Sequence, residues 1–160
     1  MLRFIKGSII ILILFEVFQI IDYKVHNYII DNIYLNSDVT NKVNYIGYIE
    51  IERLNIKREI VLGINNYNLL QHVALSKESK NLDNDTIVLA GHAIKNIFGN
   101  LKNIKENDII KIKSINKTYY YKVIDIKIIF KDKRISYDSN LTLITCFDYN
   151  KRLIVSAKRV

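Results

Sequence analysis

From Tyr45 onward the chain is a succession of short apolar segments, each separated from the next by polar residues. These segments are rich in Ile, Val and Tyr, whose branched or aromatic side chains favour strands over helices. We expect strands at residues 49–52, 56–62, 86–90, 109–115, 117–129, 141–146 and 153–157. Seven or eight short strands in about 115 residues, without an internal repeat, predict a mainly β domain closed as a barrel or packed as a sandwich.

Two local patterns refine this expectation. Residues 109–129 predict the clearest hairpin, because Ile110 and Ile112 alternate with lysines and the turn falls near Asn116. A short helix is predicted from Asn68 to Leu75, where apolar residues recur at helical spacing.

The composition limits the size of the fold and the kind of partner. The chain has 160 residues, of which 49% are hydrophobic, enough for one packed domain and an anchor. Its 24 Lys and Arg exceed its 16 Asp and Glu, for a net charge of +8. Such a surface attracts anionic partners such as lipid headgroups or wall polymers, or it is simply a solvated lysine-rich face. The basic residues are scattered and carry no nucleic-acid motif, so we expect no nucleic-acid partner.

The N-terminal residues predict a membrane anchor. Arg3 and Lys6 precede an apolar run that begins at Ile9, which is the charge order of a signal anchor. No small-residue cleavage site follows, so we expect residues 1–22 to be retained as a single transmembrane helix. A carboxylate inside the bilayer is unfavourable, so Glu16 weakens the prediction of an anchor. The alternative is a buried core helix of the domain. Residues 23–44 are polar and predict a stalk, followed by the folded domain at residues 45–160 outside the cell.

Three residues carry the candidate chemistry, each at the end of an expected strand. Cys146 ends the strand at residues 141–146, His92 follows the strand at residues 86–90 through Gly91, and Arg152 opens the last strand. A thiol becomes a strong nucleophile as thiolate, which nearby His or Arg favours. Acyl transfer also needs a proton donor and an oxyanion donor, which His92 and Arg152 can supply. Each residue alone has a simpler reading: a core cysteine, a strand-end histidine and a surface arginine.

The segments around these residues resemble motifs of the sortase family. Thr142-Leu143-Ile144-Thr145-Cys146 is similar to the signature that ends in the family's nucleophile. Ala90-Gly91-His92 resembles the histidine segment, and Arg152-Leu153-Ile154-Val155 resembles the arginine strand. Gly47-Tyr48-Ile49-Glu50-Ile51 resembles the first barrel strand. The order and separations of the motifs also match the family.

The resemblance implies an eight-stranded barrel with one or two short helices, which acts as a cysteine transpeptidase. Cys146 would attack between Thr and Gly of a signal similar to Leu-Pro-any-Thr-Gly at the C-terminus of a surface protein. His92 would move the proton, Arg152 would hold the substrate or the oxyanion, and Ala90 and Thr145 would bind the signal. The acyl fragment would pass to an amine of the cell wall precursor or of a pilin, at the membrane of a Gram-positive-type bacterium.

Departures from the family pattern bear on the cofactor and the subclass. Calcium-binding sortases carry acids before the histidine strand, whereas this chain has Lys77 and Lys80 there. We therefore expect no metal and no calcium dependence. The short connection from Phe130 to Asn140 leaves the preferred signal open. Ile144 in the variable signature position, with no large insertion, resembles class A or class D more than class B.

Two other functions remain open at this point. One is a membrane-anchored barrel without catalysis, which uses its basic surface to bind an anionic wall polymer. The other is a hydrolase built on the same residues. We expect His72, which matches no family catalytic position, to have a structural role.

Overall fold

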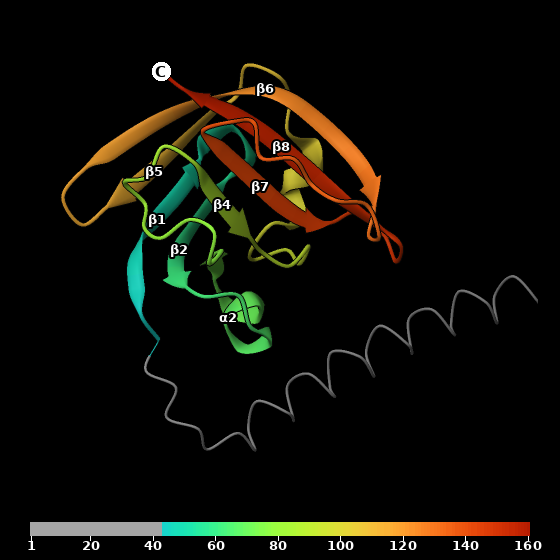
Figure 1. Cartoon of the computed structure of the whole chain (residues 1–160), viewed down its shortest axis with the longest axis horizontal. Coiled ribbons are helices and arrows are strands. Elements are labelled where there is room, and N and C mark those ends of the chain that lie inside the picture. The colour runs from blue at the N-terminus through green and yellow to red at the C-terminus, as the bar shows by residue number, and fades with distance from the viewer. Residues whose placement is uncertain (1–42) are drawn as a thin grey trace, which may run out of the picture. The chain divides into compact units, whose positions relative to one another are not determined.

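The computed structural model describes residues 43–160. Within these residues the chain forms eight strands (Figure 1). Their bounds are β1 Tyr45–Ile51, β2 Ile56–Leu62, β3 Val73–Leu75, β4 Ile87–Ala90, β5 Ile109–Ser114, β6 Thr118–Phe130, β7 Leu141–Cys146 and β8 Lys151–Arg159. One α-helix, α2 (Asn66–Gln71), and two 3-10 segments, η1 (Glu52–Leu54) and η2 (Gly99–Asn103), complete the fold.

The strands close into a barrel in the order β1-β2-β3-β4-β7-β8-β6-β5, with β5 returning to β1. The closed β-barrel implied by the family resemblance is therefore confirmed. At the closure, Gly47 in β1 pairs with Ser114 in β5. A Cβ at Gly47 would lie 2.2 Å from the Lys113 carbonyl oxygen, so the two strands can approach this closely only at a glycine.

Alternation along the strands sends one set of side chains into the barrel. In β7, Leu141 and Leu143 belong to the buried core, as do Leu153 and Val155 in β8. The residues between them face outward, because successive side chains on a strand point to opposite faces. The core is closed at its margins by residues such as Leu101 of η2.

The predicted hairpin of β5 and β6 is confirmed, with Ile110 opposite Tyr121. The pairing of β6 with β8 shifts register between Val123 and Asp125. Up to this bulge the strand alternates regularly, with Tyr121 and Val123 buried and Lys122 and Ile124 exposed. Beyond it the alternation is lost, and Ile128 is exposed. Figure 1 shows β6 and β8 as the two longest strands, running side by side over one side of the barrel.

The helix predicted from Asn68 to Leu75 is correct only in its first part. α2 begins after Asn65, whose side chain accepts a hydrogen bond from the Asn68 amide, and it ends before His72. The next residues, Val73 to Leu75, form β3 and are fully buried. They pair with β2 on one side and β4 on the other, so sheet hydrogen bonds outweigh the local helical spacing.

The anchor predicted at residues 1–22 and the stalk predicted at residues 23–44 lie outside the described residues, apart from the last two positions. Between residues 43 and 160, no helix has both the length and the apolar character that crossing a bilayer requires.

Candidate active site

The carboxyl ends of β4 and β7 meet at one place on the barrel. The two strands run parallel, with Ala90 beside Ile144, and the Gly91 amide donates a 3.1 Å hydrogen bond to the Ile144 carbonyl. His92 and Cys146 each stand two positions beyond this pair. Parallel register therefore places the imidazole and the thiol at the same strand ends.

Arg152 reaches the same place from the neighbouring strand. β7 and β8 are antiparallel, and Cys146 pairs directly with Arg152. The turn between them is held by hydrogen bonds from the Phe147 amide to the Lys151 carbonyl, 2.9 Å, and from the Asn150 amide to Asp148 Oδ1, also 2.9 Å. A short turn between paired strands thus fixes the arginine opposite the cysteine.

Cys146 lies on the outer face of the barrel wall. Leu141, Leu143 and the buried Thr145 occupy the inward positions of β7, so Ile144 and Cys146 point outward. Cys146 is exposed. A reactive thiol needs this access, whereas a core cysteine would be enclosed.

A cavity of about 330 Å³ covers this outer face and contains all five residues singled out from the sequence. These are Ala90, His92, Thr145, Cys146 and Arg152. Mostly apolar residues from other segments form the rest of the wall. Glu78 is the one carboxylate among the lining residues. The remaining lining residues are Ile64, Leu69, Ser76, Val88, Gly91, Ile135, Tyr137 and Ile144. A partly apolar cleft of this size, with a few convergent polar groups, is typical of a ligand site.

Burial in this wall changes the protonation of His92. Desolvation disfavours the imidazolium and lowers the pKa of His92 from its ordinary value of 6.5. The ring is therefore mostly neutral at neutral pH and can accept a proton. Arg152, paired with Cys146, supplies a positive charge beside the thiol.

Gly91 allows the histidine segment to pack against the residues that follow it. A Cβ at Gly91 would lie 2.8 Å from Cδ2 of Phe98 and 2.9 Å from Cγ2 of Ile97. The His92 carbonyl accepts a 3.0 Å hydrogen bond from the Phe98 amide. The backbone of His92 is therefore held by close packing on one side and a hydrogen bond on the other.

Thr145 contributes a hydroxyl with an unusual environment. Its Oγ1 is buried and has no hydrogen-bond partner within residues 43–160. A buried hydroxyl without a partner is unfavourable by about 1 to 3 kcal/mol. A bound ligand can supply the missing hydrogen-bond partner to such a hydroxyl at a cleft.

His72 lies outside the cleft. Its ring packs edge-on against Tyr45, with centroids 5.3 Å apart. Nδ1 is 3.2 Å from Oε2 of Glu59, within ion-pair distance but without the alignment of a hydrogen bond. Both contacts are to strand residues, which agrees with the expected structural role.

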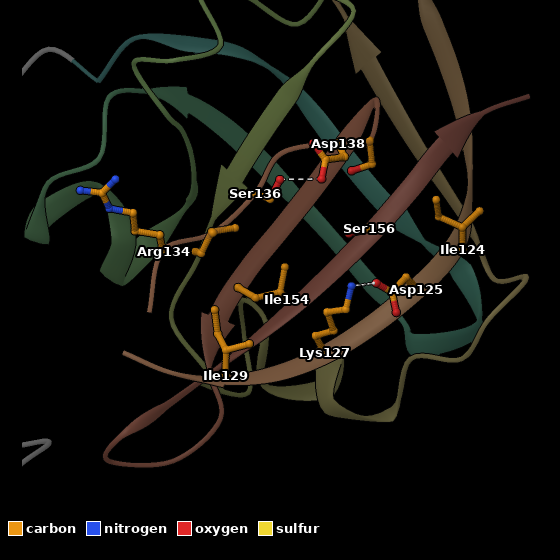
Figure 2. Close-up of a pocket in the computed structure, with 11 residues that line it drawn as sticks. Ile124, Asp125, Lys127, Ile129, Arg134, Ser136, Asp138, Ile154 and Ser156 are labelled. Atoms are coloured by element: carbon orange, nitrogen blue, oxygen red, sulfur yellow. Dashed lines mark hydrogen bonds and ion pairs between the residues drawn. The ribbon is translucent and has the colours of Figure 1, made fainter. Parts of the chain in front are cut away.

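The connection from β6 to β7 also helps to line a second hollow of about 300 Å³ (Figure 2). Ile135 lines both spaces. In the second hollow Lys127 pairs with Asp125 at 2.6 Å, and Ser136 donates a 2.5 Å hydrogen bond to Asp138. Figure 2 shows Arg134 extending away from these pairs. Asp125 and Asp138, the acidic side chains that line this hollow, therefore already have partners.

Sequence reasoning did not single out Ile64, Glu78, Ile135 or Tyr137. These residues come from three separate connections, and only the fold brings them beside Cys146. No local pattern marks a loop residue as part of a cleft. Within residues 43–160, no three His, Cys, Asp or Glu side chains gather as metal ligands would.

The comparison with protein families gives one clear result. The model of the sortase domain matches residues 49–160. Sortase A of Staphylococcus aureus is 33% identical over 130 residues, which cover 74% of this chain and 63% of that protein. The chain thus spans somewhat less than two thirds of the length of this relative.

Solved structures give the same family. Sortase A from Corynebacterium diphtheriae, in a lid mutant, has a TM-score of 0.68 and 28% identity, with 79% of this chain and 75% of that chain covered. Sortase C from Clostridium perfringens has a TM-score of 0.64 and 30% identity, with 73% and 70% covered. The match of the family model to most of the chain shows that this protein belongs to the sortase family.

Proposed function

We propose that the protein is a cysteine transpeptidase that cleaves a sorting signal and transfers the acyl fragment to an amine. The observation that carries this proposal is the meeting of Cys146, His92 and Arg152 in one cleft, with the thiol exposed. One of the similar solved structures, sortase C from Clostridium perfringens, was obtained with the C-terminal cell wall sorting motif. That structure covers 73% of this chain at 29% identity.

In the first half of the reaction, the neutral His92 takes the proton of the Cys146 thiol, and the resulting thiolate attacks the carbonyl carbon of the Thr–Gly bond. The Arg152 guanidinium donates hydrogen bonds to the carbonyl oxygen as it gains negative charge, or to the neighbouring peptide backbone. The C–N bond breaks, and the His92 imidazolium gives its proton to the departing amine. The products are a thioester on Cys146 and a neutral His92.

In the second half, an incoming amine attacks the thioester carbonyl. His92 takes the proton from the attacking nitrogen, the C–S bond breaks, and Cys146 leaves as thiolate. A new amide forms, and His92 is again protonated. The accepting amine would belong to the cell wall precursor or to a pilin.

The substrate details of the proposal follow the family resemblance. The signal is similar to Leu-Pro-any-Thr-Gly, and the subclass is A-like or D-like. Ala90 and Ile144 provide the outward floor of the cleft, and the free hydroxyl of Thr145 can bind the signal. The setting is the outer surface of a Gram-positive-type membrane, with residues 1–22 as the anchor.

The proposal is tested by incubating the full chain, in detergent, with a panel of signal peptides and primary amines. We expect mass spectrometry to show an amide between the acyl fragment and the amine, and no product from Cys146→Ala. Product formation by Cys146→Ala would contradict the mechanism. A product that carries water, even at high amine concentration, would instead identify a hydrolase.

The alternative is a barrel that binds an anionic wall polymer without catalysis. The two functions make different demands on Cys146, because a binding module has no need for an accessible thiol. The exposure of Cys146 favours the enzyme. Alkylation by iodoacetamide separates the two: it should block turnover of an enzyme and leave the polymer affinity of a binding module unchanged.

A further inference from the structure

Three exposed aromatic side chains lie at one end of the barrel. Phe130, the last residue of β6, is 55% exposed. In the turn between β7 and β8, Phe147 is 46% exposed and Tyr149 is 89% exposed. Large apolar groups that gather at the surface of a soluble domain indicate contact with another molecule or with a membrane.

Backbone contacts hold these residues together. Phe130 pairs with Lys151 at the start of β8, and the Lys131 amide donates a 2.9 Å hydrogen bond to the Asn150 carbonyl. Figure 1 shows the end of β6 beside the turn from β7 to β8. The two segments therefore form one projection, which we call the aromatic tip. It comprises residues 130–134 and 147–151.

Cations surround the rings of the aromatic tip. Nζ of Lys131 lies 5.8 Å from the ring centroid of Tyr149, and Nζ of Lys151 lies 5.6 Å from that of Phe130. One of the carboxylates of the tip, Asp148, lies 3.7 Å from Lys151 and is partly neutralised by it. The cations are Lys131, Lys133, Arg134 and Lys151, and the carboxylates are Asp132 and Asp148. The tip is therefore net positive as well as aromatic.

This combination fits the interface of an anionic membrane. Aromatic rings settle at the level of the lipid headgroups, and each nearby Lys or Arg adds attraction to anionic lipid. A soluble polyanion would use the cations and would have little use for exposed phenylalanine rings. A second copy of the chain is disfavoured as the partner, because each copy carries a net charge of +8.

We propose that the aromatic tip docks the barrel on anionic lipid headgroups, with its three rings at the interface and its lysines against the lipid phosphates. Cys146 directly precedes Phe147, and Arg152 directly follows Lys151, so docking places the active site at the membrane surface. This inference rests on the membrane setting of the proposed function but does not depend on its chemistry.

The test uses the absence of tryptophan from the chain. Tyr149→Trp places a single reporter at the tip, and Tyr120→Trp places one near the other end of β6, where Tyr120 is also exposed. The strand between Tyr120 and Phe130 spans roughly 30 Å at about 3.3 Å per residue. This is farther than the depth of about 5 to 10 Å that interfacial groups reach.

Each full chain is reconstituted into vesicles of phosphatidylcholine and phosphatidylglycerol, with or without bromine on the lipid acyl chains, and quenching of the tryptophan is measured. We expect Tyr149→Trp to be quenched at least about threefold more than Tyr120→Trp, because only the tip enters the interface. The ratio should fall to about one in vesicles of phosphatidylcholine alone, and also when Lys131→Glu and Lys133→Glu are added.

The matched control is the pair Lys113→Glu and Lys122→Glu, which reverses the charge of two exposed lysines outside the tip and should keep the ratio. Equal quenching of the two reporters, or a ratio unchanged by the substitutions at Lys131 and Lys133, would overturn the inference. Turnover of signal peptides, measured on the same samples, would show whether the proposed function fails with it. A response of Tyr149→Trp to soluble polyphosphate but not to vesicles would identify a soluble polyanion as the partner, and would also overturn the inference.

Discussion

Cys146 and Arg152 stand directly opposite each other on β7 and β8. Directly paired residues on antiparallel strands have Cα atoms about 4.5 to 5.5 Å apart and present their side chains on the same face. The guanidinium is thus placed beside the thiol by strand register and does not depend on a loop. His92, by contrast, follows β4 through Gly91, and its position depends on the packing of that glycine.

Arg152→Lys should separate charge from geometry. Lysine keeps the positive charge but loses the planar set of donors that can hold an oxyanion or a peptide backbone. We expect kcat/KM for a signal peptide to fall by about 100-fold, as when one oxyanion donor is removed, with little change in melting temperature. Lys158→Arg, an exposed change on the same strand, is the control and should leave kcat/KM within about twofold. Wild-type activity in Arg152→Lys would mean that only charge is needed.

Gly91→Ala should displace His92. The added methyl group would meet Phe98 and Ile97 at less than 3 Å, so one of these segments must shift. We expect a loss of about 1 to 3 kcal/mol in the free energy of unfolding and a fall of about tenfold or more in kcat/KM.

The control for this prediction is Leu101→Ala, which weakens the core outside the cleft by about 2 to 5 kcal/mol. At a temperature where both variants are folded, it should retain wild-type kcat/KM. An equal loss of activity in both would show that general destabilisation, and not the placement of His92, is responsible.

Thr145→Val should test the unpartnered hydroxyl. Valine has the same shape but removes a buried Oγ1 that lacks a partner within residues 43–160. We expect unfolding stability to stay equal or to rise by about 1 kcal/mol. The KM for a signal peptide should rise, because the hydroxyl that would bind the peptide is lost. Thr145→Ser keeps the hydroxyl and should keep the wild-type KM. A clear loss of stability in Thr145→Val would indicate that the hydroxyl has a partner in the free protein.

The lowered pKa of His92 predicts the direction of its pH dependence. The native state binds its proton less readily than the unfolded chain, so stability rises with pH through this group. Its contribution is unfavourable at low pH and disappears as pH rises from the native pKa through about 6.5. NMR titration of the full chain should give a His92 midpoint below 6.5. Chemical unfolding of His92→Gln against pH should lack this part of the slope, and a midpoint above 6.5 would contradict the burial effect.

Calcium should leave the rate unchanged. Lys77 and Lys80 occupy the segment where calcium-dependent relatives carry acids, and a lysine cannot ligate a hard cation. We expect millimolar calcium and a chelator to give kcat/KM values within about twofold of each other. A rise of several-fold on adding calcium would contradict this expectation.

The strands were predictable from local patterns because each one carries branched and aromatic residues bounded by polar turns. β3 was the exception. Val73 to Leu75 continue the apolar spacing of α2 and have too few residues to show a pattern of their own. Pairing with β2 and β4 decides their conformation, and these partners are distant in the sequence. The register shift between Val123 and Asp125 was equally unpredictable, because it arises from the pairing of β6 with the distant β8.

The sequence by itself determined which residue types stand at the ends of three strands, since the motifs around His92, Cys146 and Arg152 are local. The tertiary structure alone decided what surrounds them. Parallel pairing of β4 with β7 aligns the imidazole and the thiol, and the connections bring Ile64, Glu78 and Tyr137 over them. The physical reason is that strand order and loop packing depend on contacts between distant segments, which leave no periodic signal in the residues that make them.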